Sequence, residues 1–185
     1  MPPEGRLTHY AEAKTAVSQY GLARAASLGR AFLSIRLFYT FGPGQRPGAL
    51  TNKLYRCFSD GQRPALGPCE HYRDYIFVRE AAEGIRRLCE VTQSAIVNLG
   101  SGHAIRVREF ATLFWSHLGG DPGDMDFGAL PMRAGEPEQP LSYASLDRLR
   151  NLTGWAPSPS IEAGIDQTIA ALRRGPAATP QTQQG

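Results

Sequence analysis

Residues 31–41 read Ala-Phe-Leu-Ser-Ile-Arg-Leu-Phe-Tyr-Thr-Phe (AFLSIRLFYTF), and this stretch decides the fold. It is too apolar for a half-exposed strand and is typical of a strand buried on both faces of a parallel sheet. Gly42-Pro43-Gly44 follows it directly. We therefore expect a loop at the carboxyl end of the strand, which is where open α/β sheets place their ligands.

Amphipathic helices are expected on both sides of this strand. A second short buried strand is expected at residues 95–99 and an edge strand at 125–130. Because apolar strands alternate with helices, the sequence predicts an α/β protein with two or three parallel strands. A small α/β lobe is expected from residues 43–75 and 120–160. The expected helices cover residues 10–28, 49–60, 79–91, 107–118, 147–152 and 161–172.

The composition excludes several classes of protein. The chain has 185 residues, of which 42% are hydrophobic and 20% charged, as in one globular domain or a piece of a larger protein. No apolar run approaches the length of about 20 residues that a membrane span needs, and the N-terminus lacks a signal-peptide core. The net charge of +3 comes without a basic run interleaved with aromatic residues, so nucleic-acid binding is not expected.

The cysteines and histidines do not predict a metal site. The chain has 3 Cys and 4 His, and neither set has metal-ligand spacing. We interpret the cysteines as reduced thiols of a cytoplasmic protein. The tail, residues 173–185, is rich in Pro, Thr and Gln and is expected to be disordered.

Tyr10 and Lys14 are candidate catalytic residues. They lie four residues apart in the first expected helix, so they share one face. Bringing the ionisation of a phenol from about pH 10 to about pH 7 requires roughly 4 kcal/mol. A lysine about 8 Å away supplies about 2 kcal/mol at an effective dielectric constant of about 20. A second cation, such as an oxidised nicotinamide, would have to supply the rest; the alternative is an ordinary solvated helix face.

Several segments, taken in order, resemble the NAD-dependent epimerase/dehydratase family of extended short-chain dehydrogenase/reductases, which act on nucleotide sugars. The resemblance runs from Tyr10 to about Leu172. A further segment, Leu130 to Pro137, is similar to 4-ketoreductases and 4-epimerases of deoxysugars. The matching segments are Tyr10–Lys14 (Tyr-x-x-x-Lys), Ile35–Gly44 (Arg…Gly-Pro), Arg73–Val78 (Arg-Asp-aromatic-x-x-Val), Asn98–Gly102 (Asn-x-Gly-x-Gly) and Gly154–Pro157 (Gly-Trp-x-Pro).

The resemblance implies a role for each candidate site residue. Tyr10 would be the general acid/base at a sugar hydroxyl or ketone, and Lys14 would hold the nicotinamide ribose of NAD or NADP. Arg73 and Arg133 would grip the diphosphate of the nucleotide sugar. Tyr39 would contact the substrate at a position where many relatives carry Asn. The implied fold is a partial Rossmann-like, doubly wound sheet with a small α/β substrate-binding lobe.

The departures from the family matter as much. Residues 1–172 resemble only its C-terminal half, so the Gly-x-x-Gly-x-x-Gly phosphate turn has no counterpart. Gly100-Ser101-Gly102 lacks the third glycine and the acidic residue about twenty positions later, so it is not expected to bind a dinucleotide. NAD or NADP is therefore not expected to bind well to this chain alone.

Three hypotheses stay open. The chain is the substrate half of a nucleotide-sugar epimerase, dehydratase or reductase, completed by a cofactor-binding partner chain. Alternatively, it is a non-catalytic nucleotide-sugar binding module, or an inactive truncated remnant. Self-association into a homo-oligomer is also expected, since the strand at 31–40 lacks its usual neighbours on one side.

Overall fold

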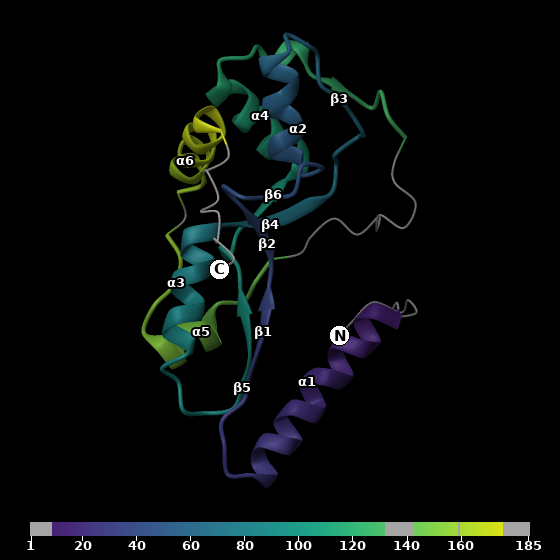
Figure 1. The fold of residues 1–185 in the computed structure, drawn as a ribbon. Helices are drawn as coiled ribbons and strands as arrows, with labels where there is room; N and C mark the ends of the chain where they lie inside the picture. The colour runs from purple at the N-terminus through teal and green to yellow at the C-terminus, as the bar shows by residue number, and fades with distance from the viewer. Residues whose placement is uncertain (1–8, 132–142, 159, 176–185) are drawn as a thin grey trace, which may run out of the picture.

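The computed structural model describes residues 9–131, 143–158 and 160–175 and has the predicted α/β architecture (Figure 1). The expected helices are all present, with limits within a few residues of the prediction. The helices are α1 (His9–Ser27), α2 (Leu50–Ser59), α3 (Val78–Leu88), α4 (Val107–Leu118), α5 (Asp147–Thr153) and α6 (Ile161–Arg174), with the short 3₁₀ helix η1 (Pro122–Asp124). The strands are β1 (Leu33–Leu37), β2 (Tyr39–Phe41), β3 (Ala65–Leu66), β4 (Tyr72–Phe77), β5 (Ala95–Leu99), β6 (Ala104–Arg106) and β7 (Asp126–Phe127).

β1 and β5 form the parallel pair that the sequence predicts, with Leu33 opposite Ala95 and Leu37 opposite Leu99. The pair is covered on both faces. On one face the Ser34 hydroxyl lies 2.7 Å from that of Ser18 in α1. On the other face Ile35 packs with the buried side chains of α3, because successive strand residues point to opposite faces. The doubly wound arrangement is confirmed.

The prediction of one strand buried on both faces over residues 31–41 is wrong in detail. β1 ends at Leu37, the Phe38 amide donates to the Leu99 carbonyl, and the chain then enters β2. β2 pairs in parallel with β4, with Tyr39 opposite Tyr75. Leu37 is 48% exposed and Tyr39 55% exposed. β1 pairs only with β5 within the described residues, so its other edge has no partner strand there.

β4 is the middle strand of a three-stranded sheet with the order β2, β4, β6. β6 runs antiparallel to β4, with Tyr72 opposite Arg106, and it was not predicted. β7 lies within the predicted edge strand at 125–130 but has only two residues, and it pairs in parallel with β3. β3 was not predicted either, because residues 61–70 have the Pro/Gly-rich composition of a loop.

An aromatic core holds together the upper part of Figure 1, which we call the aromatic lobe: β2, β4, β6, α2, α4 and α6. The Tyr75 ring stacks on the Phe110 ring, with centroids 3.9 Å apart and planes 10° apart. Phe41 meets Phe110 edge to face at 5.3 Å. Phe114 extends the cluster along α4. Such ring pairs are worth about 0.5–1.5 kcal/mol beyond the burial of their area.

A second core lies between the β1–β5 pair, α3 and α5. Its buried members include Ile76, Leu88, Leu99 and Leu149. Gly84 in α3 permits close approach of the helix to the sheet, since a Cβ there would lie 2.6 Å from Leu99 Cδ1 and 3.0 Å from the Trp155 ring. Trp155 is therefore a packing residue.

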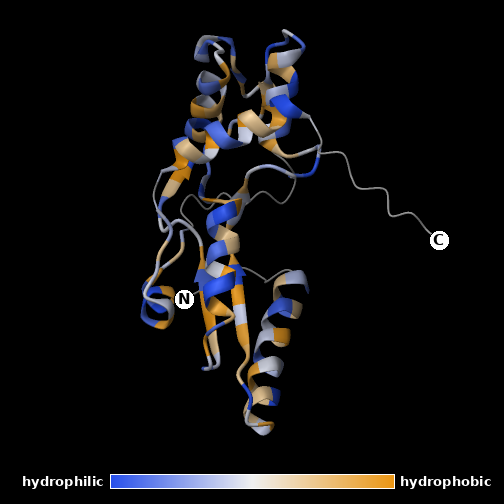
Figure 2. Cartoon of the chain, turned by 60° about the vertical axis from the view of Figure 1, so that its left-hand side comes forward, coloured by the Kyte–Doolittle hydropathy of each residue, from blue (hydrophilic) through white to orange (hydrophobic). Residues whose placement is uncertain are grey.

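α1 is packed far less tightly than the other long helices. Its closest packing lies toward its C-terminus, where a Cβ on Gly21 would meet the Phe32 ring at 2.3 Å and where Ala25 is buried. Toward its N-terminus α1 leans away from β1 (Figure 1). Hydrophobic residues are spread along this helix (Figure 2). Four of its large side chains are exposed: Tyr10 at 68%, Val17 at 66%, Tyr20 at 72% and Leu28 at 51%.

The C-terminal helix is longer than predicted. α6 begins at Ile161, where the Ser160 side chain accepts a hydrogen bond from the Ala163 amide, and it continues through Arg174. The tail that the sequence predicts to be disordered starts at residue 173. Its first two residues are helical in the structure. Residues 176–185 lie outside the described part of the chain.

Candidate functional site

A cavity of about 620 Å³ opens in the aromatic lobe beyond the carboxyl end of β2. This is the position that the strand-to-loop pattern predicts. Its volume lies within the range of about 300–1,000 Å³ that is usual for small-molecule sites. Its walls come from β2, the loop before α2, α2 itself, the segment between β3 and β4, and the first turn of α4, with Leu130 and Pro131 at one side.

The loop between β2 and α2 is held in shape by Gln45. The Gln45 side-chain amide donates to the Thr40 carbonyl at 2.9 Å, and its side-chain oxygen accepts from the Thr51 hydroxyl at 2.6 Å. The Asn52 amide donates to the backbone carbonyls of Gln45 and Arg46. Gly42 begins the loop at φ 143°, and a Cβ there would lie 2.5 Å from Val78 Cγ1. This wall of the cavity is therefore built by specific contacts.

The charged side chains that line the cavity are cations. Arg46, Lys53 and Arg73 contribute to the lining, and among the described residues that line it there is no Asp or Glu. The Lys53 ammonium donates to the Ala65 carbonyl, which is neutral, so its positive charge is not compensated there. The cavity thus favours an anionic ligand.

One hydrogen-bond donor of Arg73 has no partner among the described residues. Its Nη1 donates to the Tyr72 carbonyl at 3.0 Å. Its Nε is buried and has no partner within the described part of the chain. A buried donor left unpaired costs about 1–3 kcal/mol. Because Arg73 also lines the cavity, its positive charge is what a ligand there would meet.

Of the sequence-predicted site residues, the structure brings Tyr39 and Arg73 together. Both line the cavity, and Arg73 Cζ lies 5.0 Å from the centroid of the Tyr39 ring. Tyr10 and Lys14 do share a helix face, as expected, with Lys14 Nζ 4.4 Å from the Tyr10 ring centroid. That geometry places the ammonium over the face of the ring. Neither Tyr10 nor Lys14 belongs to the lining of this cavity.

Arg133 lies outside the described residues, together with most of the segment Leu130 to Pro137. Its expected contact with a diphosphate therefore stays a prediction. Leu130 and Pro131, at the start of that segment, do line the cavity.

Asp74 has a structural role in this region. Its buried carboxylate accepts hydrogen bonds from the amides of Ser101 at 2.6 Å, Gly102 at 3.0 Å and Ala144 at 2.9 Å, and from the Ser101 hydroxyl at 2.7 Å. A Cβ on Gly100 would lie 2.5 Å from Asp74 Oδ2. The amides of Ser101 and Gly102 thus already serve a carboxylate, and this turn does not fit the pyrophosphate of NAD or NADP.

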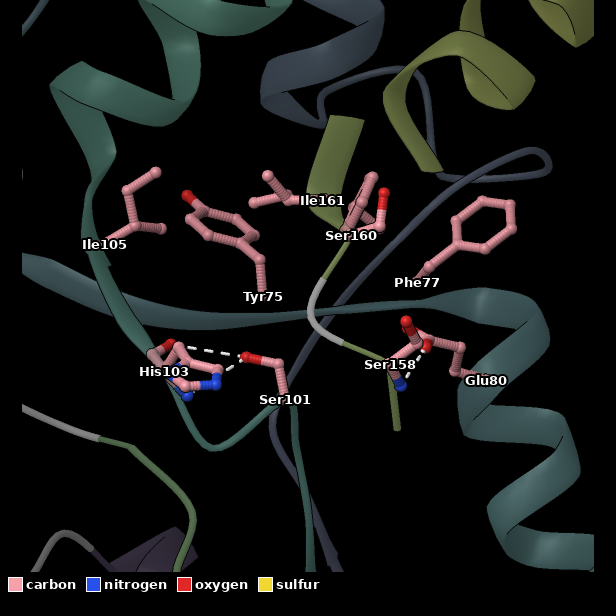
Figure 3. A pocket seen from close by; sticks show the side chains of 10 residues that line it. Tyr75, Phe77, Glu80, Ser101, His103, Ile105, Ser158, Ser160 and Ile161 are labelled. Carbon is pink, nitrogen blue, oxygen red and sulfur yellow. Dashed lines mark hydrogen bonds between the residues drawn. The ribbon is translucent and has the colours of Figure 1, made fainter. Parts of the chain in front are cut away.

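A second, smaller cavity of about 120 Å³ lies between β4 and the start of α6 (Figure 3). At its edge the Ser158 amide donates to Glu80 at 2.7 Å. Burial raises the pKa of the Glu80 carboxyl. This cavity is too small for a nucleotide, and its contacts join α6 to α3 and β4.

Residues 1–100 match the model of the NAD dependent epimerase/dehydratase family. The chain belongs to this family. That confirms the resemblance of its motifs, which include the Tyr10–Lys14 and Ile35–Gly44 segments within the matched range.

Similarity to individual family members extends over most of the chain. It is 25% identical over 175 residues to UDP-glucuronic acid decarboxylase 1 from Xenopus tropicalis, covering 93% of this chain and 40% of the relative. It is 27% identical over 158 residues to a probable UDP-glucuronate 4-epimerase from Rhizobium meliloti (strain 1021), covering 74% and 45%. The chain therefore spans less than half the length of these relatives.

The fold also matches solved family structures. UDP-N-acetylglucosamine 4-epimerase from Methanobrevibacter ruminantium M1, in complex with UDP-N-acetylmuramic acid, superposes with a TM-score of 0.79 at 21% identity. The match covers 93% of this chain and 58% of that enzyme. At this identity the likeness establishes the fold.

Metal clusters and membrane-spanning helices were also sought among the described residues. Within residues 9–131, 143–158 and 160–175, no group of three His, Cys, Asp or Glu side chains is placed to hold a metal ion. No helix in the same ranges is both long and apolar enough to span a bilayer.

Sequence reasoning did not identify Gln45, Arg46 and Lys53 as site residues. Lys53 lies within an ordinary amphipathic helix, and only the tertiary fold brings it to the cavity. Gln45 and Arg46 follow the Gly-Pro-Gly turn directly. The expectation of a ligand loop at the end of the strand could have singled them out.

Proposed function

We propose that this chain is the substrate-binding half of an NAD(P)-dependent nucleotide-sugar epimerase, dehydratase or 4-ketoreductase. The cavity carries this proposal: it has the volume of a small-molecule site, and the described residues of its lining include the cations Arg46, Lys53 and Arg73 and no carboxylate. Nucleotide sugars present a diphosphate, which a planar guanidinium matches well. The names of both curated relatives, which refer to UDP-glucuronic acid or UDP-glucuronate, support this ligand class.

Each part of the site has a proposed task. Arg73 and Arg133 bind the diphosphate, with Lys53 and Arg46 adding to the positive field of the cavity. The loop after Gly42 and the region near Tyr39 contact the sugar or the base. Shared recognition by several side chains of this kind orients the ligand as well as holding it.

We further infer that a second polypeptide holds most of the nicotinamide dinucleotide. In the described part of this chain, the turn at residues 100–102 has its amides engaged by Asp74, so it offers no cradle for a pyrophosphate. In the completed assembly Tyr10 moves the proton at a sugar hydroxyl or ketone, with Lys14 beside it.

Calorimetry on the chain without added NAD tests the binding half of the proposal. A panel of UDP-, TDP-, CDP- and GDP-sugars should contain a ligand. Arg73→Ala should weaken its binding by about one to two orders of magnitude, since a charge-assisted hydrogen bond contributes roughly 1.5–3 kcal/mol. Arg79→Ala, which removes the same charge from an exposed position outside the cavity lining, should bind like the wild type. Equal affinity of wild type and Arg73→Ala would refute the assignment.

Reconstitution tests the catalytic half. With a Gly-x-x-Gly-x-x-Gly domain added, Tyr10→Phe should lower turnover by about 10²–10⁴, the usual contribution of positioned acid/base catalysis. In the isolated chain the same substitution should leave nucleotide-sugar binding unchanged. Robust turnover by the isolated chain with NAD(H) or NADP(H) would contradict the need for a partner. Binding without any turnover in a complete assembly would favour the binding module, and failure to fold and bind would favour the inactive remnant.

A further inference from the structure

We propose that Tyr39 is a positioning residue whose ring, rather than its hydroxyl, fixes the guanidinium of Arg73 for the ligand. The inference rests on the proposed function, because it concerns the same cavity. It differs from the expectation drawn from the family, in which the residue at this position contacts the nucleotide sugar through a hydrogen bond.

Strand register places the two side chains together. Tyr39 lies directly opposite Tyr75 in the parallel pair of β2 and β4. Arg73 precedes Tyr75 by two residues, so both point to the same face of β4. Arg73 is therefore the diagonal neighbour of Tyr39, within reach of a long side chain. The distance of 5.0 Å from Arg73 Cζ to the Tyr39 ring centroid is within the range of a cation–π contact.

The ring of Tyr39 is itself supported by the ring of Tyr75. It meets the ring of Tyr75 edge to face, with centroids 6.0 Å apart. Tyr75 stacks on Phe110, which is fully buried in the core of the aromatic lobe. The platform under Arg73 is thus connected to the core, although Tyr39 is itself more than half exposed. An exposed aromatic side chain supported in this way can restrict a guanidinium without a hydrogen bond.

Two observations favour the ring of Tyr39 as the group that restrains Arg73. Among the described residues, no hydrogen bond of the Tyr39 hydroxyl is found, whereas the ring has contacts to both Arg73 and Tyr75. Arg73 is also held on its other side, by the bond from Nη1 to the Tyr72 carbonyl. With the guanidinium restrained by the Tyr39 ring and by the Tyr72 carbonyl, its positive charge is fixed beside the cavity that Arg73 lines. Asn at position 39 would supply no ring face and would leave Arg73 less restricted.

Binding measurements on a graded set of variants test the inference, with UDP-glucuronic acid and the rest of the nucleotide-sugar panel as probes. Tyr39→Phe keeps the ring and should bind within about twofold of wild type. Tyr39→Leu and Tyr39→Ala lose the π face and should bind about threefold to thirtyfold more weakly, the range that a cation–π contact spans. In the Arg73→Ala background, Tyr39→Ala should have no further effect. Thermal unfolding should be similar throughout, because Tyr39 is exposed.

A second readout needs no ligand. In wild type and Tyr39→Phe the Arg73 Nε–H resonance should show a ring-current shift, and in Tyr39→Leu it should lose it. If Tyr39→Phe binds as weakly as Tyr39→Ala, or if the effects of Tyr39→Ala and Arg73→Ala add, the inference is wrong. An Arg73 resonance that does not respond to Tyr39→Leu also overturns it. If no nucleotide sugar binds the wild type, the proposed function fails, and the resonance still decides whether the ring orders Arg73.

Discussion

The aromatic lobe and the region formed by α1 and β1 treat large apolar side chains in opposite ways. In the lobe, Phe41, Phe110 and Phe114 are buried and in contact with one another. In α1, Val17 and Tyr20 are exposed, and β1 has an edge without a partner strand in the described residues. Neighbouring apolar side chains that stay exposed mark a surface for another polypeptide. We therefore expect the lobe to be stable by its own contacts, and α1 with β1 to be the part that another polypeptide segment covers.

The largest effect should come from the core of the lobe. Phe110→Ala removes a fully buried ring that contacts Phe41, Tyr75 and Phe114, and it should lower the free energy of unfolding by about 4 kcal/mol. Tyr20→Ala, at an exposed aromatic position in α1, should change it by less than about 0.5 kcal/mol. Urea unfolding of both variants measures the contrast. Similar losses in the two would show that α1 is packed as firmly as the lobe.

A somewhat smaller effect is expected at Asp74, which joins β4 to the end of β5 and to Ala144. In Asp74→Asn, an amide group would face N–H donors that now bind a carboxylate. We expect a loss of about 2–3 kcal/mol, because buried donors are left unpaired. Asp60→Asn, at an exposed position after α2, is the matched control and should be nearly neutral. If Asp74→Asn leaves the free energy of unfolding unchanged in the same experiment, this carboxylate does not stabilise the junction of β4 with the turn after β5 and with Ala144.

Two glutamates of α3 should give stability opposite dependences on pH. Hydrogen bonds from Arg86 and then Arg87 lower the pKa of Glu83 from 4.5 to about 2. Its stabilising contribution is therefore present above about pH 4.5 and is lost as the pH falls toward 2. Burial raises the pKa of Glu80 above 4.5, so its contribution is full below that pH and is lost as the pH rises.

Thermal unfolding between pH 2 and pH 7 separates the two. Glu83→Gln should lose less stability than the wild type as the pH falls toward 2, because the side chain that faces Arg86 and Arg87 no longer titrates. The stability of Glu80→Gln should equal that of the wild type below pH 4.5 and should exceed it increasingly as the pH rises. A Glu80→Gln variant that loses stability relative to wild type as the pH increases would contradict the direction of its pKa shift.

Substitutions on α1 should have the smallest effect on the free energy of unfolding, but they should change the oligomeric state. The isolated chain should self-associate through the apolar side of α1 and the open edge of β1. Replacing Val17 and Tyr20 by Lys should shift it toward a monomer with a change in unfolding free energy within about 0.5 kcal/mol. Light scattering over a range of concentrations measures this. A wild-type chain that is a monodisperse monomer with a cooperative melt at high temperature would show that the surface needs no partner.

Local patterns were enough to predict the helices and one strand. α4 begins at Val107 and ends at Leu118, as expected, because its apolar stripe is complete and Gly119 stops it with a left-handed φ of 101°. β5 also has its predicted limits. In both cases the signal lies within the element itself.

What the sequence could not show depends on distant partners. Nothing local in residues 31–41 marks the change at Phe38, where the chain leaves one strand partner for another. Of the candidate site, Tyr39 and Arg73 could be named from the family motifs. Their contact follows from the register of β2 and β4, and the place of Lys53 follows from the packing of α2, which no spacing encodes.

The carboxylate of Asp74 also has a consequence for the order of folding. Its partners at Ser101, Gly102 and Ala144 are 27, 28 and 70 positions away in the chain. Closing such loops costs entropy before the contacts form, so these bonds belong to a late step. Interactions absent from the transition state act mainly on the rate of unfolding. Asp74 should therefore govern how long the native state persists, while the rate at which the chain reaches it is set elsewhere.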